Sequence, residues 1–396
     1  MDGVSIVEAV RTPFGRFGGR LREHSAVELG GIVVRAALER ARVRPEEVDE
    51  TVFGTALLAA ATMVAARQVN FKAGISSDTP SLTIDRACCS SMTSIGLASM
   101  KIRLGEARVV LAGGFDSSSQ TPFLMRDARW GRRLGDFKVE DPMQMRNPIN
   151  QKAIALVTGE MAIKWGVSRD EQDDWAFASH QKYFEATDRG IYQEEILPVE
   201  VREDGSLTSF GIDESPRRDI RRERLRALPT VYGSPTITAG NAPGLNDGAS
   251  IAVLMSSKEV QRRGCEPLGE LVSYSQLCGD LESSVYMPGL AILAALKQAG
   301  LSLGDLKRIE INEAFAAMPL VSTKRIAGED ARLLARLRAI TNPNGGSVAL
   351  GHPPGASGAR IVMALVRELR RLGGGYGAAA ICGGFGQADA VIVKVS

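Results

Sequence analysis

The sequence is poor in histidine, in paired cysteines and in long hydrophobic runs. It contains three histidines and five cysteines among 396 residues, and no two cysteines are spaced as C-x-x-C. An odd number of such cysteines argues against a disulfide framework and favours a reducing compartment. No apolar run approaches the length of a membrane span. The net charge of +2 is too small to favour nucleic acid or an anionic membrane as a partner.

The length and composition indicate a globular α/β protein with more than one lobe. A chain of 396 residues is longer than an ordinary single-core domain. Hydrophobic residues make up 44% and charged residues 24%, as in proteins that bury a sizeable core. The first residues lead straight into an apolar stretch without a basic and apolar leader, so we expect a cytoplasmic protein.

Two parts of the chain share one order of predicted elements. A helical pattern over 88–105 precedes an apolar strand that ends in Gly-Gly-Phe at 113–115, and a helical pattern over 355–372 precedes one that ends in Gly-Gly-Phe at 383–385. This similarity predicts a duplicated α/β unit with equivalent loops at the same edge of paired sheets. We therefore expect the turns that contain three reactive side chains to open towards one crevice. These side chains are Cys88, His352 and Cys382.

The segment between the two repeats has a different composition. It is rich in arginine, aspartate, glutamine and methionine, and it shows no regular pattern of buried strands. We expect it to form a lid, because functional loops are carried by rigid scaffolds. The predicted division is an N-terminal half at 1–117 with 246–267, a lid at 118–245, and a C-terminal half at 268–396.

Cys88 precedes a run of small and apolar residues at helical spacing. The spacing predicts that the thiol lies in the first turn of a helix, where free backbone amides stabilise a negative sulfur. Such a position lowers the pKa of a thiol and makes it a nucleophile. The alternative is that Cys88 and Cys89 are small core residues, because free cysteine is often buried.

His352 and Cys382 also lie in glycine-rich turns. Acyl transfer through a thioester needs a thiol, a base and donors that hold an oxyanion. His352 suits the base, and the amides of Cys88 and Gly384 suit the donors. His352 and Cys382 also have structural explanations. A histidine in a turn can satisfy backbone carbonyls, and a cysteine before a Gly-Gly bend can be inert. The other two histidines, His24 and His180, are interpreted as helix-associated side chains without a catalytic role.

Seven short motifs span the chain. They are VRTPFG at 10–15, the Cys88 turn, TAGNA at 238–242, NDGA at 246–249, NEAFA at 312–316, GHP at 351–353 with GASGAR at 355–360, and CGG at 382–384. In this order and spacing they resemble the motifs of thiolases, which interconvert 3-ketoacyl-CoA plus CoA with acyl-CoA plus acetyl-CoA. The resemblance implies an α/β/α/β/α sandwich of two βαβαβαββ halves with an inserted lid. It also implies a homodimer or homotetramer that uses CoA as a substrate, without a metal or other cofactor.

The resemblance assigns a role to each candidate catalytic residue. Cys88 would take the acyl group after activation by His352, and Cys382 would move the proton on the acetyl carbon. Asn312 would hold a water that forms one oxyanion hole with His352, and the amides of Cys88 and Gly384 would form the other. The residues expected to bind CoA or the acyl chain are Arg217, Ala242, Pro243, Ala314 and Phe315.

Several positions depart from the thiolase pattern. Asp85 stands where the family has asparagine, Pro243 replaces a serine that often faces CoA, and Phe385 stands where glycine is common. The lid has Ile-Ala at 154–155 in place of a His-Met pair. These departures argue against strict acetoacetyl specificity and favour a longer, branched or ring-bearing acyl chain.

The arginine-rich stretch at 216–226 has two interpretations. Such a charge run can be a solvated face, or it can hold the phosphates of CoA, since guanidinium groups match phosphate oxygens. Among related enzymes, a ketosynthase would need a second histidine in a matching turn, and a hydroxymethylglutaryl-type synthase would use glutamate in place of Cys382. A catalytically silent, thiolase-like protein that binds acyl-CoA is the alternative from another class.

Overall fold

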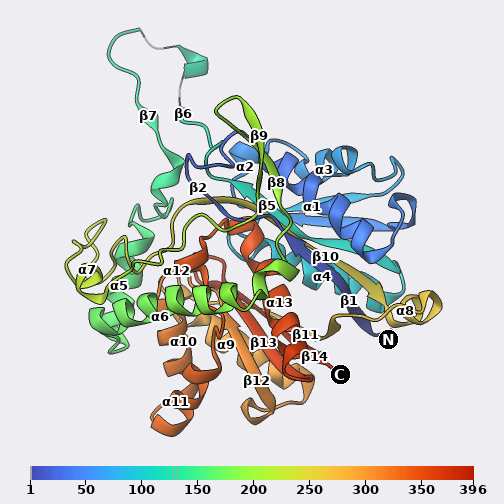
Figure 1. Cartoon of the computed structure of the whole chain (residues 1–396). Coiled ribbons are helices and arrows are strands. Elements are labelled where there is room, and N and C mark those ends of the chain that lie inside the picture. Colours follow the sequence, from blue (N-terminus) through green and yellow to red (C-terminus); the bar gives the residue numbers. More distant parts are fainter. Residues whose placement is uncertain (1, 127, 132) are drawn as a thin grey trace.

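A ten-stranded mixed sheet forms the centre of the protein (Figure 1). The computed structural model describes residues 2–126, 128–131 and 133–396. The strand order is β12-β13-β14-β11-β1-β10-β5-β3-β4, and the short β2 (Gly15–Arg16) also pairs with β10. The N-terminal strands are β1 (Val4–Arg11), β3 (Glu50–Gly54), β4 (Ser81–Ile84), β5 (Val109–Ser117) and β10 (Asn246–Ser256). The C-terminal strands are β11 (Gly269–Cys278), β12 (Leu306–Ile311), β13 (Gly375–Cys382) and β14 (Gln387–Val395).

The two halves of this sheet repeat one topology. In the N-terminal half, β3 and β5 are parallel, and β5, β10 and β1 follow as antiparallel neighbours. In the C-terminal half, β12 and β13 are parallel, and β14 and β11 follow in the same way. The halves join through β1 and β11, which pair at Ser5 with Glu270 and at Ile6 with Gly269. The paired sheets expected from the sequence are therefore hydrogen-bonded into one.

The helices form three layers around the two half-sheets. Helices α4 (Ser90–Leu104) and α13 (Pro354–Arg371) lie between the halves and contact strands of both. The outer face of the N-terminal half is covered by α1 (Ala26–Ala41) and α3 (Ala65–Ala73), and that of the C-terminal half by α9 (Met287–Ala299). Further helices are α2 (Leu58–Ala61), α8 (Ser257–Arg263), α10 (Ala317–Ala327), α11 (Ala331–Ile340) and α12 (Ser347–Leu350). This order of layers confirms the predicted sandwich.

Local capping explains where two of the helices begin and end. Ser25 and Glu28 form a capping box at the start of α1, in which the Ser25 hydroxyl accepts a hydrogen bond from the Glu28 amide. Helix α4 ends at Leu104 because Gly105 adopts a left-handed conformation with φ of 78°. None of the described helices combines the length and the hydrophobicity that a membrane crossing requires.

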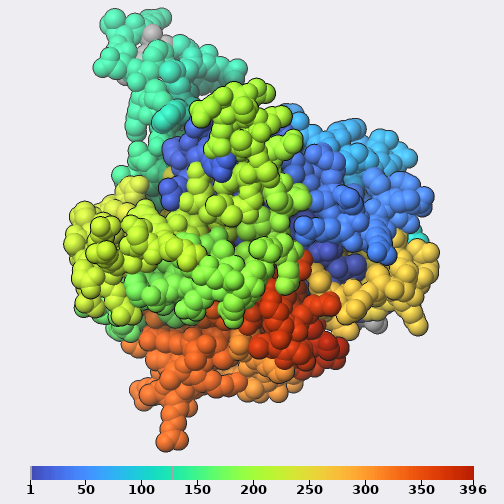
Figure 2. Space-filling view, in the orientation of Figure 1, coloured from blue at the N-terminus to red at the C-terminus, as the bar shows by residue number. Residues whose placement is uncertain are grey.

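The inserted segment contains more regular structure than the sequence predicts. Besides α5 (Ile154–Lys164), α6 (Arg169–Asp188) and α7 (Arg222–Arg226), it forms a hairpin of β8 (Val199–Glu203) and β9 (Ser206–Phe210). The expectation of no buried strand is wrong, because Val199, Val201 and Phe210 join the core cluster of the N-terminal half. Strands β6 (Leu124–Met125) and β7 (Val139–Glu140) pair in an arm that stands out from the body (Figures 1 and 2).

A buried charge cluster fastens this insertion to the first strand. Arg11 is fully buried and donates two hydrogen bonds to Asp213, at 2.6 and 2.9 Å, and one to Glu195 at 2.8 Å. Asp213 also accepts the amide of Phe14. Paired and hydrogen-bonded charges of this kind are costly to separate, since removing one partner leaves the other buried and unpaired. The insertion is therefore held to the scaffold at β1.

Candidate active site

Cys88 lies in a strained turn immediately before α4. Cys89 is the residue that caps the helix, so the thiol is one position ahead of the predicted first turn. Ala87 has a φ of 49°, which is uncommon for a residue other than glycine. The Asp85 carboxylate accepts the Ala87 amide at 2.9 Å, and the Ser90 hydroxyl donates to the Ala87 carbonyl at 2.6 Å. Asp85 thus provides the side-chain oxygen that stabilises this turn.

An ion pair connects the turn to the C-terminal half. Arg86 donates to Asp389 at 2.6 Å and to Gln387 at 3.1 Å, both on β14. The second oxygen of Asp389 accepts the hydroxyls of Thr93 and Tyr274. Because Asp389 is fully buried and binds groups from both halves, the turn is fixed relative to both halves of the sheet.

His352 contacts the Cys88 thiol directly. Its Nε2 is 3.2 Å from Cys88 Sγ, and its Nδ1 is 2.6 Å from the Ser357 hydroxyl. The Ser357 hydroxyl donates its only hydrogen to the Pro353 carbonyl at 2.8 Å, so towards His352 it acts as an acceptor. The imidazole proton is therefore on Nδ1, and Nε2 presents a lone pair to the thiol.

The loop that carries His352 is held by two buried side chains. The side-chain oxygen of Asn246, Oδ1, accepts a hydrogen bond from the His352 backbone amide at 2.9 Å. A side chain at Gly351, whose φ is 105°, would overlap Asn246. Asp116, at the end of β5, accepts the Gly355 amide at 2.6 Å and the Thr55 hydroxyl at 2.7 Å. The imidazole is thus positioned by contacts from both sides of its loop.

Burial keeps both reacting groups neutral. It raises the pKa of the Cys88 thiol well above its usual value, and the nearby Cys382 and Asp116 raise it further. Burial also lowers the pKa of His352 to about 3, with a smaller contribution from Arg360. The expectation that the helix N-terminus lowers the pKa of Cys88 is wrong for the resting protein, because loss of solvation outweighs the helix amides.

Cys382 and Gly384 border the same cavity as Cys88. Cys382 is the last residue of β13 and is buried, and this burial raises its pKa to about 11 despite the amides of Gly384 and of Cys382 itself. A cavity of about 80 Å³ is lined by Cys88, Cys382 and Gly384, among others. The three residues therefore border one cavity, and the roles expected of the two thiols and the Gly384 amide stay predictions.

Asn312 follows β12 and is buried with one free donor. Its carbonyl oxygen accepts the Ser347 hydroxyl at 2.7 Å. Its side-chain nitrogen, Nδ2, is buried and has no hydrogen-bond partner in the described part of the protein. A buried donor without a partner is costly and calls for an explanation such as a bound water or ligand. This free amide is consistent with the water-holding role expected for Asn312.

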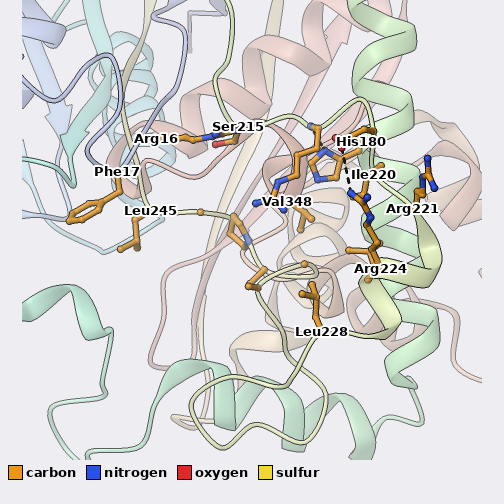
Figure 3. A pocket seen from close by; sticks show the side chains of 18 residues that line it. Arg16, Phe17, His180, Ser215, Ile220, Arg221, Arg224, Leu228, Leu245 and Val348 are labelled. Carbon is orange, nitrogen blue, oxygen red and sulfur yellow. Dashed lines mark hydrogen bonds and ion pairs between the residues drawn. The ribbon is translucent and has the colours of Figure 1, made fainter.

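The five predicted binding residues divide between two cavities. Arg217, Ala242 and Pro243 line a cavity of about 530 Å³ (Figure 3), whereas Ala314 and Phe315 line the small cavity beside the cysteines. In Figure 3 the larger cavity has the side chains of Arg16 and Phe17 at one end and those of His180 and Arg224 at the other.

The arginines of the stretch at 216–226 form two sets, one paired with α6 and one lining the larger cavity. Arg218, Arg222 and Arg226, spaced four residues apart, form ion pairs with acidic residues of α6. A second set lines the larger cavity and consists of Arg217, Arg221 and Arg224. Among the described residues, no carboxylate forms an ion pair with Arg217 or Arg221. The interpretation as a surface charge run therefore fits the first set, and phosphate binding by the second set stays a prediction.

His180 is a cavity residue that the sequence analysis missed. It is buried on α6 and lines the larger cavity, and its Nδ1 accepts the Arg217 amide at 3.1 Å. Burial lowers its pKa to about 4, and Arg217 adds to this effect. The signal in the sequence was its spacing from Ala176 and Tyr183, which places His180 on the buried face of the helix.

Comparison with known proteins gives the same family over the whole chain. Residues 4–258 match the family model "Thiolase, N-terminal domain" and residues 265–395 match "Thiolase, C-terminal domain". The mitochondrial 3-ketoacyl-CoA thiolase of Pongo abelii is 39% identical over 100% of this chain and 98% of its own length. A crystal structure of the Bacillus anthracis acetyl-CoA acetyltransferase has a TM-score of 0.94 and 36% identity, covering 100% of this chain and 99% of that one. Human mitochondrial 3-ketoacyl-CoA thiolase in complex with CoA has a TM-score of 0.93 and 38% identity, covering 100% and 98%.

The fold, the site and these relatives define an acyltransferase. The chain belongs to the thiolase family. Its function is that of the acetyl-CoA and 3-ketoacyl-CoA acyltransferases of this family.

Proposed function

We propose that this thiolase works through a covalent acyl group on Cys88, either cleaving 3-ketoacyl-CoA with CoA or condensing two acyl-CoA molecules. The observation that carries the proposal is the 3.2 Å contact between the Cys88 thiol and the unprotonated Nε2 of His352. As the sulfur attacks a substrate carbonyl, Nε2 takes the thiol proton, and Ser357 accepts a hydrogen bond from Nδ1–H throughout. Because Cys88 and His352 are both neutral before substrate binds, the protein avoids the free-energy cost of a buried thiolate.

In cleavage, attack on the 3-keto carbon gives a tetrahedral oxyanion. The amides of Cys88 and Gly384 donate to this oxygen, and Gly384 has no side chain to block the approach. The bond between carbons 2 and 3 then breaks, which leaves the acyl group on Cys88 and releases acetyl-CoA as its enolate.

Cys382 protonates carbon 2 of this enolate. Its thiol has a pKa raised to about 11, so it keeps its proton until a strongly basic carbanion develops. The enolate oxygen is stabilised by His352 and by a water on the free amide of Asn312. The Cys382 thiolate then takes the proton of the incoming CoA thiol, and the CoA sulfur attacks the acyl group on Cys88. The bond between this group and Cys88 breaks, and the Cys88 sulfur takes back its proton from His352. In condensation the same steps run in reverse.

The larger cavity is proposed as the CoA site. Among the described residues, Arg217 and Arg221 of this cavity have no carboxylate partner, and their positive charge suits the phosphates of CoA. Pro243 and Ala242 then face the pantetheine arm, and the small cavity takes the acyl chain against Ala314 and Phe315. The human relative has been solved with CoA, which supports a site of this kind. In this proposal, residues 118–245 form the CoA-binding lid between the halves at 1–117 with 246–267 and at 268–396.

We also propose a homodimer or homotetramer in the cytoplasm. Strand β4 lies at the edge of the large sheet and exposes Leu82, and Met100 and Leu104 are exposed on the adjacent α4. An unpaired edge strand beside apolar side chains favours pairing with a second copy. The five cysteines form no disulfide, which suits a reducing compartment. Light scattering should give at least twice the mass of one chain; a monomer at micromolar concentration would contradict this proposal.

A spectrophotometric assay tests the function. Wild-type protein should cleave a 3-ketoacyl-CoA when CoA is added, and Cys88→Ser should lose this activity by at least about 10³-fold. Cys265→Ser is the control, because Cys265 lies outside both cavities. Binding of acyl-CoA without turnover by the wild type would instead favour a silent acyl-CoA-binding protein.

A further inference from the structure

The turn after Cys382 contains three consecutive residues with positive φ. The values are 65° at Gly384, 50° at Phe385 and 79° at Gly386. Glycine adopts this conformation freely, but a bulky side chain there is a genuine outlier. Phe385 is therefore the one residue of the three whose backbone is strained by its side chain.

The backbone around Phe385 is held by its neighbours. Gly383 donates to the Gln387 carbonyl at 2.9 Å, and Gln387 donates to the Gly384 carbonyl at 3.0 Å. Gly386 donates to the Ser284 hydroxyl at 2.8 Å, and a side chain at Gly386 would overlap the carbonyl oxygen of Gly279. The conformation of the turn is thus imposed by contacts in which the Phe385 side chain takes no part. Strain that persists under such constraint often marks a functional site.

The Phe385 side chain lines the small cavity that contains both reactive sulfurs. Its other lining residues include Ile154 and Val157 of α5, and Val285 and Met318. Val285 and Met318 belong to one apolar cluster with Cys382, and Val157 packs against this cluster. The cavity therefore suits a hydrocarbon chain attached to Cys88, and Phe385 is one of its walls.

An ion pair limits the same cavity elsewhere. Lys152, in the insertion, lies 3.3 Å from Glu282 in the C-terminal half, and both residues line the cavity. The volume of about 80 Å³ corresponds to roughly five to eight groups of water size, at about 10–15 Å³ each. A chain longer than this would have to displace the Phe385 ring or open the ion pair.

We propose that Phe385 sets the size of the acyl pocket and restricts it to short, unbranched, apolar acyl groups. This inference rests on the proposed function and names its substrate class. It differs from the sequence-based expectation of a longer, branched or ring-bearing chain. The phenyl ring of Phe385 closes the pocket beside Cys382, and this role explains why position 385 is phenylalanine despite a backbone conformation that favours glycine.

Two substitutions separate the effect on the pocket from the effect on the backbone. Phe385→Gly and Phe385→Ala both remove the ring, but only glycine also removes the strain at positive φ. Both variants should raise kcat/KM for long-chain relative to short-chain 3-ketoacyl-CoA substrates by about tenfold or more. Phe385→Gly should also have a higher Tm than Phe385→Ala.

The measurement is kcat/KM over a series of straight-chain substrates from four to sixteen carbons. Phe385→Leu, which keeps an apolar side chain of similar reach, should retain a chain-length profile closer to that of the wild type. If both smaller variants keep the wild-type profile while Cys88 is still acylated, the assignment of Phe385 is overturned and the proposed function stands. If Cys88 of the wild type takes no acyl group, the proposed function fails and this inference with it.

Discussion

Replacing Ser357 with alanine removes the one contact that fixes the proton of His352. In the structure the Ser357 hydroxyl donates to Pro353 and accepts from His352 Nδ1, at 2.8 and 2.6 Å. Without this acceptor, Nδ1–H is buried and unsatisfied, which costs about 1–3 kcal/mol. The imidazole can avoid this cost by moving its proton to Nε2, but it then cannot accept the Cys88 proton.

The expected result is slower acylation of Cys88. A free-energy cost of about 1–3 kcal/mol corresponds to a rate decrease of about 5- to 150-fold. Rapid quenching after mixing with acyl-CoA, followed by mass spectrometry, gives the acylation rate. Nitrogen NMR of labelled histidine should show the shift of the His352 proton towards Nε2, which a loss of stability alone would not produce.

Ser275→Ala is the matched control for this experiment. Ser275 is also buried and donates one hydrogen bond, to the Ala291 carbonyl at 2.8 Å, outside both cavities. It should lose some stability and keep the wild-type acylation rate. A folded Ser357→Ala variant that is acylated as fast as Ser275→Ala would refute the tautomer assignment.

Three further predictions concern the second thiol, the CoA site and pH. Cys382→Ser should still be acylated on Cys88 but should exchange the α-protons of acetyl-CoA about 10²- to 10⁴-fold more slowly, measured by NMR in deuterated water; normal exchange would exclude its proposed role. Arg217→Ala should raise KM for CoA by about 10- to 150-fold with little change in kcat, since a hydrogen bond to a charged group contributes about 1.5–3 kcal/mol. Arg218→Ala is its control, because Arg218 pairs with Asp188, and equal effects of the two would contradict the proposed site. The pKa of buried His180 is lowered to about 4 from 6.5, so the folded state binds fewer protons than the unfolded state between these pH values. The contribution of His180 to the free energy of unfolding therefore falls as the pH falls from about 6.5 to 4. In urea unfolding, His180→Gln should lose less stability over this range than the wild type, and an equal loss would show that His180 is not the cause.

Features set by neighbouring residues could be predicted from the sequence. The capping box at Ser25 and the glycine at 105 mark helix boundaries through contacts of a few residues. The two Gly-Gly-Phe strand ends indicated the repeat, because equivalent turns in a duplicated unit keep similar sequences. The repeat predicts that the turns of Cys88 and His352, which are 264 positions apart, open towards one crevice, and the resemblance to thiolases implies their contact.

Features set by the surroundings could not be predicted in this way. The pKa of Cys88 depends on how deeply the thiol is buried, and burial reverses the direction that its helix position suggests. The hairpin at 199–210 contributes side chains to a core whose other members lie far away in the chain. The role of Ser357 becomes visible only when its hydrogen bonds to both Pro353 and His352 are known.

The most direct measurement is to identify the peptide that becomes acylated when the wild-type protein is mixed briefly with acyl-CoA and then quenched and digested. The proposed mechanism predicts one acyl group per chain, on the peptide that contains Cys88, and a much slower appearance of this adduct in His352→Ala. An adduct on Cys382 instead, or none on either cysteine of a protein that still cleaves 3-ketoacyl-CoA, would contradict it.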